Sequence, residues 1–248
     1  SLTAGLEDSG AVRQRLRDLR GAPKFDSAAA PAARTTTTAG VRSGLPVLGV
    51  APEFTGTQRW RNTPGDRPLT LAGLRGKVVL IDFWTYSCIN CLRTLPYLKA
   101  WDAKYRKDGL VIVGVHAPEF GFEKDAGNVA EAIRSNGIRY PVVQDNDLAT
   151  WNAWGNQYWP AEYLVDAQGR VRATKFGEGK YDESEADIRA LLAEAGRAAP
   201  DGYVQPKGAI VPSEQTSPET YLGSERAQGW VDPPIDGVHS YGRPPATL

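Results

Sequence analysis

Methionine is absent from this chain of 248 residues, and cysteine and histidine occur only twice each. A structural zinc site needs about four ligands. Beyond Cys88 and Cys91 the chain offers only His116 and His239, and His239 falls in a tail rich in proline and glycine. We therefore expect no metal centre, and no motif in the sequence indicates another cofactor.

Long apolar runs and an excess of charge of one sign are also missing. Lys and Arg number 29, as do Asp and Glu, so we expect no nucleic-acid partner, which would need clustered basic residues. A helix that crosses a bilayer takes about 20 apolar residues, and the longest apolar runs here are 78–84 and 110–115. The chain starts at Ser1 without an apolar signal region, which is typical of a piece of a longer or processed protein.

Composition divides the chain into three parts. Residues 1–44 combine a polar helical segment, 1–20, with a stretch rich in alanine, threonine and proline, 21–44, that predicts a linker. Residues 45–196 have the apolar periodicity of a globular domain. Residues 197–248 are rich in proline and glycine and predict an irregular C-terminal extension.

Strand and helix patterns alternate within the predicted domain. That order, ending in a hairpin and a helix, predicts an α/β fold with a mixed central sheet and helices on both faces. The strands are expected at 78–84, 110–115, 140–144, 161–166 and 171–176, with short β segments at 51–54 and 60–62, and the helices at 88–107, 123–136, 147–154 and 181–195.

The two cysteines form the segment Cys88-Ile89-Asn90-Cys91, directly after a strongly apolar predicted strand. A Cys-x-x-Cys pair between a strand and a helix is typical of a redox-active dithiol. Unpaired N–H groups and the helix dipole favour a thiolate at the helix start, so Cys88 is the predicted nucleophile. Cys91, about one turn deeper, would attack the mixed disulfide and close a Cys88–Cys91 disulfide.

Three other uses of the cysteine pair are open at this point. A zinc site lacks ligands, as described above. A structural disulfide closed over two residues would constrain the unfolded chain very little. A pair of buried, unreactive thiols is the third alternative, because free cysteine is often a small core residue. The position of the pair after a strand and at a helix start favours the redox role.

The segment 82–96, Asp-Phe-Trp-Thr-Tyr-Ser-Cys-Ile-Asn-Cys-Leu-Arg-Thr-Leu-Pro, resembles the active-site block of thioredoxin-like proteins. The resemblance implies a thioredoxin-like fold with the buried family aspartate at Asp82, and it includes Trp84 among the residues that support the site. It also implies a helix proline at Pro96 and a cis-proline at Pro160, after Trp159. An additional strand and helix before Pro160 are similar to those of the TlpA-like, extracytoplasmic branch.

The same resemblance implies roles for the residues around the sulfurs. A buried Asp82 would have a raised pKa and would take the proton of Cys91 through a water. The backbone of Trp159, next to the cis-proline, would pair with an extended substrate strand. Thr94 stands where TlpA-like and ResA-like proteins carry a glutamate, and Glu119 is a candidate for a substitute carboxylate near the site.

The segments 84–91 and 115–120 are similar to the C-terminal part of DipZ-type membrane thiol:disulfide interchange proteins. This resemblance implies an extracytoplasmic thiol:disulfide oxidoreductase at the bacterial cell membrane. Such a protein passes electrons from its own CcdA-like transmembrane part to the disulfides of protein substrates. Residues 216–223 resemble the start of a further β-rich module, through which a DipZ-type protein would contact carbohydrate.

A second function class shares the thiolate chemistry. Thr85-x-x-Cys88 is similar to the Thr-x-x-Cys of peroxiredoxins, although Ile81 replaces the proline that this family carries. The alternative function is therefore a thiol peroxidase of the redoxin class. Ile89 and Asn90 replace the Gly-Pro of thioredoxin itself, and Ser87 replaces a common tryptophan, so the sequence does not fix the reduction potential.

Overall fold

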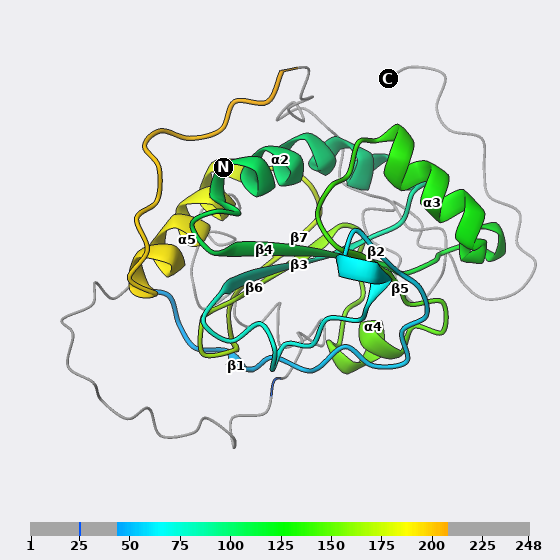
Figure 1. Ribbon diagram of the computed structural model, residues 1–248, viewed down its shortest axis with the longest axis horizontal. Coiled ribbons are helices and arrows are strands. Elements are labelled where there is room, and N and C mark those ends of the chain that lie inside the picture. Colours follow the sequence, from blue (N-terminus) through cyan, green and yellow to red (C-terminus); the bar gives the residue numbers. More distant parts are fainter. Residues whose placement is uncertain (1–24, 26–43, 208–248) are drawn as a thin grey trace, which may run out of the picture. The chain divides into compact units, whose positions relative to one another are not determined.

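Seven consecutive residues, Val78–Trp84, form strand β3, and every one of them is buried. The computed structural model describes Phe25 and residues 44–207, and in these residues β3 is the middle strand of a seven-stranded sheet (Figure 1). Its strands, in sheet order, are β1 (Gly49–Val50), β7 (Arg170–Phe176), β6 (Ala161–Val165), β3, β4 (Leu110–His116), β5 (Val142–Gln144) and β2 (Trp60–Arg61).

The sheet is mixed, as predicted. Strand β3 pairs in parallel with β4 and antiparallel with β6. A parallel neighbour needs a crossover connection, and here the crossover is the helix that begins beside the cysteines. The helices are α2 (Ile89–Tyr105), α3 (Ala126–Ser135), α4 (Ala149–Ala153) and α5 (Tyr181–Glu194), with short 3-10 turns η1 (Pro64–Asp66) and η2 (Gly121–Lys124).

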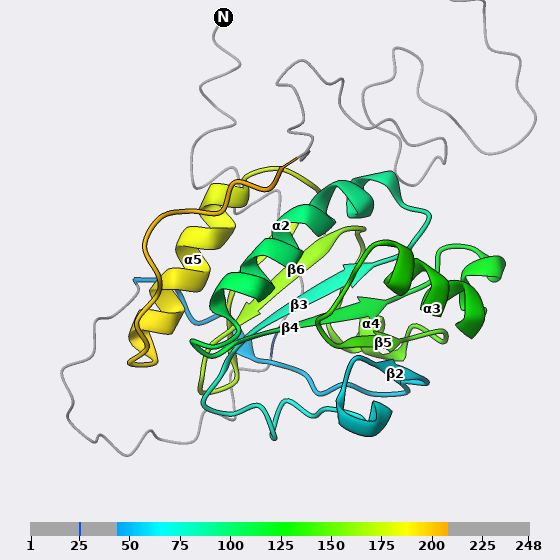
Figure 2. The same ribbon diagram turned by 45° about the horizontal axis from the view of Figure 1, so that its top comes forward.

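Alternate residues of β3 face two separate cores. Leu80 and Trp84 belong to the core under α2, α3 and α5, and Ile81 and Phe83 belong to the core on the side of α4. Figures 1 and 2 show α2, α3 and α5 on one face of the sheet and α4 on the other. Asp82 therefore lies on the face of β3 that α2 covers, because side chains alternate along a strand.

Two predicted boundaries are wrong for local reasons. The β segment expected at 51–54 is absent, and β1 lies just before it, since Pro52 has no N–H with which to extend the ladder. The helix expected at 123–136 is split into η2 and α3, because Asp125 caps α3 by accepting from the Asn128 N–H at 2.8 Å. The remaining strands and helices occur where they were expected, within a few residues.

Several predicted features lie outside the described residues. These are the helix at 1–20, most of the linker, residues 216–223 and His239. Phe25 of the predicted linker packs edge-on against Trp154 and Tyr163, with ring centroids 6.1 Å apart in both pairs. At the other end, the N–H of Val204 donates to Glu185 at 2.9 Å. The described parts of both predicted extensions thus contact the domain.

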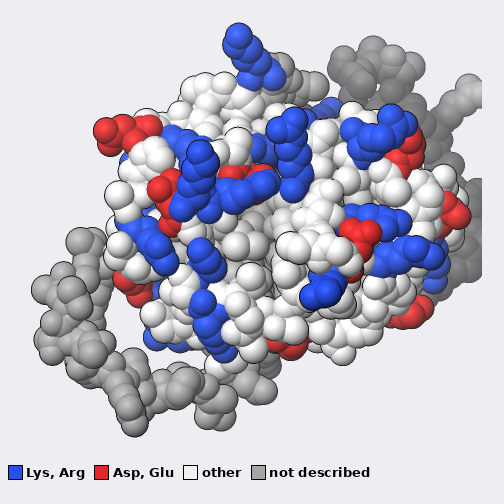
Figure 3. All heavy atoms as spheres, in the orientation of Figure 1, with Lys and Arg blue, Asp and Glu red and all other residues white. Residues whose placement is uncertain are grey.

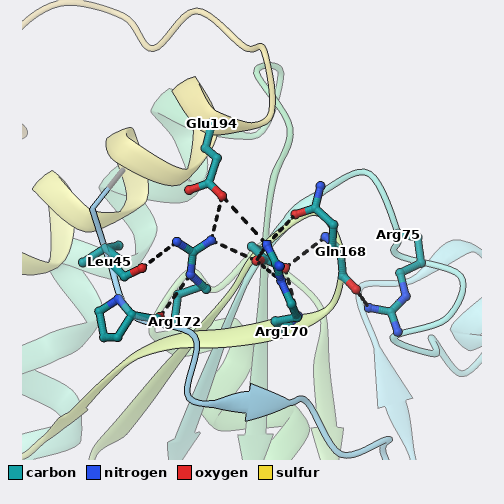
Figure 4. Close-up of polar contacts among 8 residues, drawn as sticks. Leu45, Arg75, Gln168, Arg170, Arg172 and Glu194 are labelled. Atoms are coloured by element: carbon teal, nitrogen blue, oxygen red, sulfur yellow. Dashed lines mark hydrogen bonds and ion pairs between the residues drawn. The ribbon is translucent and has the colours of Figure 1, made fainter. Parts of the chain in front are cut away.

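A buried arginine connects the start of the domain to its end (Figure 4). Arg172 in β7 is 5% exposed and donates to the carbonyl oxygens of Leu45 at 2.7 Å and Pro46 at 3.1 Å. The same guanidinium lies 3.0 Å from Asp166 and 2.8 Å from Glu194 at the end of α5. Four partners, two carbonyl oxygens and two carboxylates, compensate the burial of this charge.

The outer surface carries charges of both signs. Basic and acidic side chains lie next to one another on the face drawn in Figure 3, in keeping with the formal net charge of zero. Within residues 44–207, no helix has the length and apolar content of a membrane-crossing segment.

Candidate active site

The chain leaves the carboxyl end of β3, passes through residues 85–87 and enters α2 at Ile89. Cys88 is the N-cap of this helix, with an extended backbone, and the N–H of Cys91 donates to its Sγ at 3.3 Å. Side-chain acceptors at this position satisfy one of the unpaired N–H groups of the first helical turn. The predicted helix start at Cys88 thus places the sulfur against backbone donors.

The two thiols are unequal. Hydrogen bonding from the Cys91 thiol, and then from the backbone N–H groups of Cys91 and Asn90, lowers the pKa of the half-buried Cys88, against the opposing effects of burial and of Glu119. Cys91 is 1% exposed, and burial together with its bond to Cys88 raises its pKa well above the ordinary value. Cys88 is suited to attack as a thiolate, whereas Cys91 is held as a protonated thiol.

Asp82 lies in β3, on the face that α2 covers. It is 1% exposed, and burial, followed by the negative charge of Glu162, raises its pKa well above the ordinary value. Neither carboxylate oxygen has a hydrogen-bond partner among the described residues. The charge of Asp82 contributes to the raised pKa of Cys91, and that of Cys88 to the raised pKa of Asp82.

The Trp159–Pro160 bond is cis, as the family resemblance implied. Strand β6 begins directly after it, and the pairing of Phe83 with Ala161 brings Pro160 beside the carboxyl end of β3. The indole N–H of Trp159 donates to the carbonyl oxygen of Ala117 at 2.9 Å. Pro160 and Trp159 therefore lie at the sheet end from which the cysteine loop leaves.

Trp84 is fully buried and lies under this loop. Its ring contacts His116 edge-on, with centroids 5.3 Å apart, and His116 in turn stacks on Tyr86 at 5.5 Å. Burial lowers the pKa of His116 to about 4, so the ring is neutral at pH 7. Its Nε2 lies 3.3 Å from Oγ1 of Thr85. Trp84 and His116 thus support residues 85–87 from the side of the core.

The substitute carboxylate expected at Glu119 is exposed to solvent. The buried acid of this segment is instead Glu123, which is fully buried and which the sequence analysis missed. Its Oε2 accepts from the N–H groups of Glu119 at 2.6 Å and Phe120 at 2.8 Å, and its Oε1 accepts from the hydroxyl of Ser87. The signal in the sequence is an acid three residues after Phe120, at the start of a helical turn.

Glu123 fixes the loop that precedes Cys88. Burial alone would raise its pKa, but hydrogen bonds from Ser87, Thr85 and the two backbone N–H groups outweigh burial and lower the pKa. A charged acceptor with several donors is a strong connection. It joins Ser87, directly before Cys88, to residues 119–122. Among the described residues no cluster of three or more His, Cys, Asp or Glu side chains has the arrangement of a metal site.

The comparisons with known proteins agree with this geometry. The profile of the family described as Redoxin matches residues 49–192. The chain is 49% identical over 181 residues to protein DipZ of Mycobacterium tuberculosis, in an alignment that covers 72% of this chain and 26% of DipZ. It is 32% identical to the thiol-disulfide oxidoreductase YkuV of Bacillus subtilis, covering 58% of this chain and 94% of YkuV.

A solved structure shows the same fold. The solution structure of a thioredoxin-like protein in the oxidized form superposes with a TM-score of 0.53 at 33% identity, covering 58% of this chain and 95% of that one. The chain spans only 26% of the length of DipZ, so the family assignment concerns the domain and not that whole protein. On the profile match, the relatives and the fold, the chain belongs to the redoxin family, and its residues 49–192 form a thioredoxin-like domain of the kind found in DipZ.

Proposed function

We propose that this chain is a thiol:disulfide oxidoreductase that reduces protein disulfides on the extracytoplasmic side of the bacterial cell membrane. The observation that carries the proposal is the inequality of the two thiols. A half-buried Cys88 with a lowered pKa lies beside a buried Cys91 with a raised pKa. Attack by an accessible thiolate, followed by attack from a shielded thiol, is the order of events in thiol–disulfide exchange.

The reaction passes two electrons from the dithiol to the substrate. The Cys88 thiolate attacks one sulfur of the substrate disulfide, which forms a mixed disulfide and releases the first substrate thiolate. Cys91 gives its proton to Asp82 and attacks Sγ of Cys88. The second substrate thiolate leaves, and the protein retains the Cys88–Cys91 disulfide.

The surface beside Cys88 suits a polypeptide substrate. Ile89 is 58% exposed, and Phe120 and Phe122 are 50% and 57% exposed. The two phenylalanine rings stack 5.6 Å apart, and the Tyr86 hydroxyl donates to the carbonyl oxygen of Phe122 at 3.1 Å. Exposed apolar side chains gathered beside a reactive group are typical of an interaction surface. We propose that this surface, together with the backbone of Trp159, holds the chain on either side of the substrate disulfide.

The source of electrons is the part of the proposal that depends on similarity to DipZ. We propose that a CcdA-like transmembrane part of the same protein reduces the Cys88–Cys91 disulfide again. The direction of transfer is tested by the reduction potential of the pair in a glutathione or dithiothreitol redox buffer. A value near that of thioredoxin, about −270 mV, supports a reductant, and a value near about −120 mV contradicts this direction.

Turnover tests the role of the cysteines. In a coupled assay with a protein disulfide as substrate, we expect Cys88→Ser to abolish turnover, because the attacking sulfur is lost. Cys91→Ser should stop after the first step. Unchanged turnover in the Cys88→Ser variant would rule out the proposed function.

A thiol peroxidase is the alternative from the same family. In the Thr-x-x-Cys pattern, the Thr85 hydroxyl would assist Cys88. Here Thr85 is fully buried, and its hydroxyl lies 3.3 Å from His116 Nε2. This contact favours a supporting role for Thr85. Stopped-flow mixing with hydrogen peroxide separates the two functions: slow oxidation of Cys88 is expected, and fast second-order oxidation would favour the peroxidase.

A further inference from the structure

We propose that Glu162 acts through Asp82 as the next acceptor of the proton that Cys91 loses, and that this proton leaves through the cavity between β6, β7 and α5. The inference rests on the proposed function, because it assigns a route to a proton of the same reaction. Asp82 is 1% exposed, so a proton that it takes from Cys91 needs a path out of the core before the next cycle.

The sheet register offers one ionisable neighbour beside Asp82. On β4 the residue opposite Asp82 is Gly114, and on β6 it is Glu162. A Cβ atom at position 114 would lie 3.0 Å from Trp84 Nε1 and 3.2 Å from the Tyr140 ring, so this position is kept small by its neighbours. Residues directly opposite one another in antiparallel strands have Cβ atoms about 5 Å apart on the same face. Glu162 is thus the carboxylate next to Asp82.

Glu162 connects Asp82 to the next strand and to α5. It is 4% exposed, it lies 3.4 Å from Nζ of Lys175, and it accepts from the hydroxyl of Ser184 at 3.1 Å. Lys175 is the register partner of Glu162 on β7. Asp82, Glu162 and Lys175 therefore form a row across three strands, and we call these three residues the buried charge row.

A small cavity adjoins the outer end of the buried charge row. Its volume is about 40 Å³, and its polar lining includes Glu162, Lys175, Ser184 and the half-buried Asp187. A water needs about 10–15 Å³ of such space and two or more polar partners, so the cavity has room for water beside Glu162. Asp187 lies on α5 toward solvent and completes a polar path outward.

The two outer members of the buried charge row act on Asp82 with opposite sign. The negative charge of Glu162 raises the pKa of Asp82, and the positive charge of Lys175 lowers it. Neutralising Glu162 should therefore lower the pKa of Asp82, and neutralising Lys175 should raise it. The ionisable groups that face Asp82 are Glu162 on β6, Lys175 on β7, Cys88 and Cys91 at the start of α2, and the buried phenol of Tyr140 before β5, while α5 reaches the row through Ser184.

In the resolving step the Cys91 S–H bond breaks, its proton goes to Asp82, and the new Cys88–Cys91 bond forms as the bond from Cys88 to the substrate sulfur breaks. The substrate disulfide is the oxidant and leaves as thiolate. Protonated Asp82 then passes its proton to Glu162, and water in the cavity carries it to solvent.

The test measures the resolving step alone, in the full chain. The reduced protein is mixed with 5,5′-dithiobis(2-nitrobenzoate), whose first thiolate is released by Cys88 and whose second is released when Cys91 attacks. The rate of the second release is recorded against pH for the wild type, Glu162→Gln and Lys175→Gln. Glutamine keeps the size of Glu162 and can still accept from Ser184, but it neither takes a proton nor carries a charge.

We expect the midpoint of the pH profile to move to lower pH in Glu162→Gln and to higher pH in Lys175→Gln. Under repeated turnover with excess reductant and disulfide, the plateau rate of Glu162→Gln should also fall, because the proton on Asp82 has lost its next acceptor before the next cycle. Asp82→Asn should slow the second release by about 100-fold or more, as loss of a general base does. In the Asp82→Asn background, Glu162→Gln should cause no further change, because it acts through Asp82.

Glu183→Gln is the matched control, because it makes the same change of charge on α5 at a side chain that is 70% exposed. It should leave the profile unmoved. Midpoints that stay fixed or move in the same direction, a wild-type plateau of repeated turnover in Glu162→Gln, or an effect that persists without Asp82 would overturn the inference. A wild-type protein that releases no second thiolate would instead contradict the proposed function.

Discussion

The backbone N–H of Cys91 donates to Sγ of Cys88 across 3.3 Å, a contact that favours the thiolate form of Cys88. The thiol of Cys91 makes the largest contribution to the lowered pKa of Cys88. Burial, and then the bond between the two thiols, raises the pKa of Cys91. This difference in pKa suits the proposed order of exchange, in which Cys88 attacks first and Cys91 second.

Alkylation should report this dependence directly. In the wild type, Cys88 should react with iodoacetamide with a midpoint at lower pH than an ordinary thiol, whereas the buried Cys91 reacts slowly. In Cys91→Ala the midpoint should move up, because the thiol that donates to Cys88 is gone. The measurement is the rate at which the first alkyl group adds to the protein, followed by mass spectrometry as a function of pH. An unchanged midpoint in the variant would show that Cys91 does not stabilise the thiolate.

Asp82→Asn should change the pH dependence of folding. Burial raises the folded pKa of Asp82 above its unfolded value of about 4. The folded state therefore carries no penalty from this group below pH 4, and the penalty grows as pH rises toward the folded pKa. Urea unfolding from pH 4 to 8 should show the variant gaining stability relative to the wild type as pH rises. Parallel stability curves would contradict the assigned burial of Asp82.

The local part of the site was predictable from the sequence because it depends on neighbours in the chain. The apolar run of β3, the Cys-x-x-Cys spacing and the start of α2 follow from residues within about one strand and one helix. The buried Asp82 and the cis bond before Pro160 came from family resemblance, and the structure confirms both positions.

The carboxylates that surround the site could not be assigned from the sequence. Glu123 meets Ser87 across 36 positions of the chain, and Glu162 meets Asp82 only through the register of β3 and β6. Sequence pattern marks both as ordinary polar residues, because their burial depends on tertiary contacts. For the same reason the sequence indicates Glu119, which is exposed, and gives no sign that Glu123 is buried.

Glu123→Gln should loosen the loop before Cys88. An amide offers one acceptor oxygen in place of two and sets its own N–H groups against the donors of Glu119, Phe120 and Ser87. We expect a loss of about 2 kcal/mol in the free energy of unfolding at pH 7.

The pKa of Glu123 is lowered in the folded state. The greater stability of the wild type is therefore present above the unfolded pKa of Glu123. It should disappear as the pH falls through the lowered folded pKa. Glu131→Gln, at an exposed position on α3, is the control and should have no effect. Equal stability of Glu123→Gln and wild type at pH 7 would refute the role of this network.

Arg172→Met should destabilise the domain strongly. The substitution removes the more buried of the two cations that pair with Asp166, which is 3% exposed, and leaves only Arg170 as its partner. Breaking a buried ion pair costs about 3–5 kcal/mol when the remaining charge is unpaired. Because Arg170 still pairs with Asp166, we expect a loss at the lower end of that range, which chemical denaturation would measure. Arg134→Met, which removes an exposed partner of Glu131, should leave the unfolding midpoint unchanged. Similar midpoints for the two variants would show that the Arg172 cluster contributes little.

The most direct test of the account is the trapped intermediate. The Cys91→Ser variant, mixed with a peptide that contains one internal disulfide, should accumulate a covalent complex whose intact mass equals protein plus the whole peptide, because the released thiolate stays on the peptide. Peptide mapping should place the link at Cys88. Cys88→Ser should form no such complex, because Cys91 is buried. A complex formed equally by both variants, or by neither, would contradict the assignment of Cys88 as nucleophile and Cys91 as the resolving thiol.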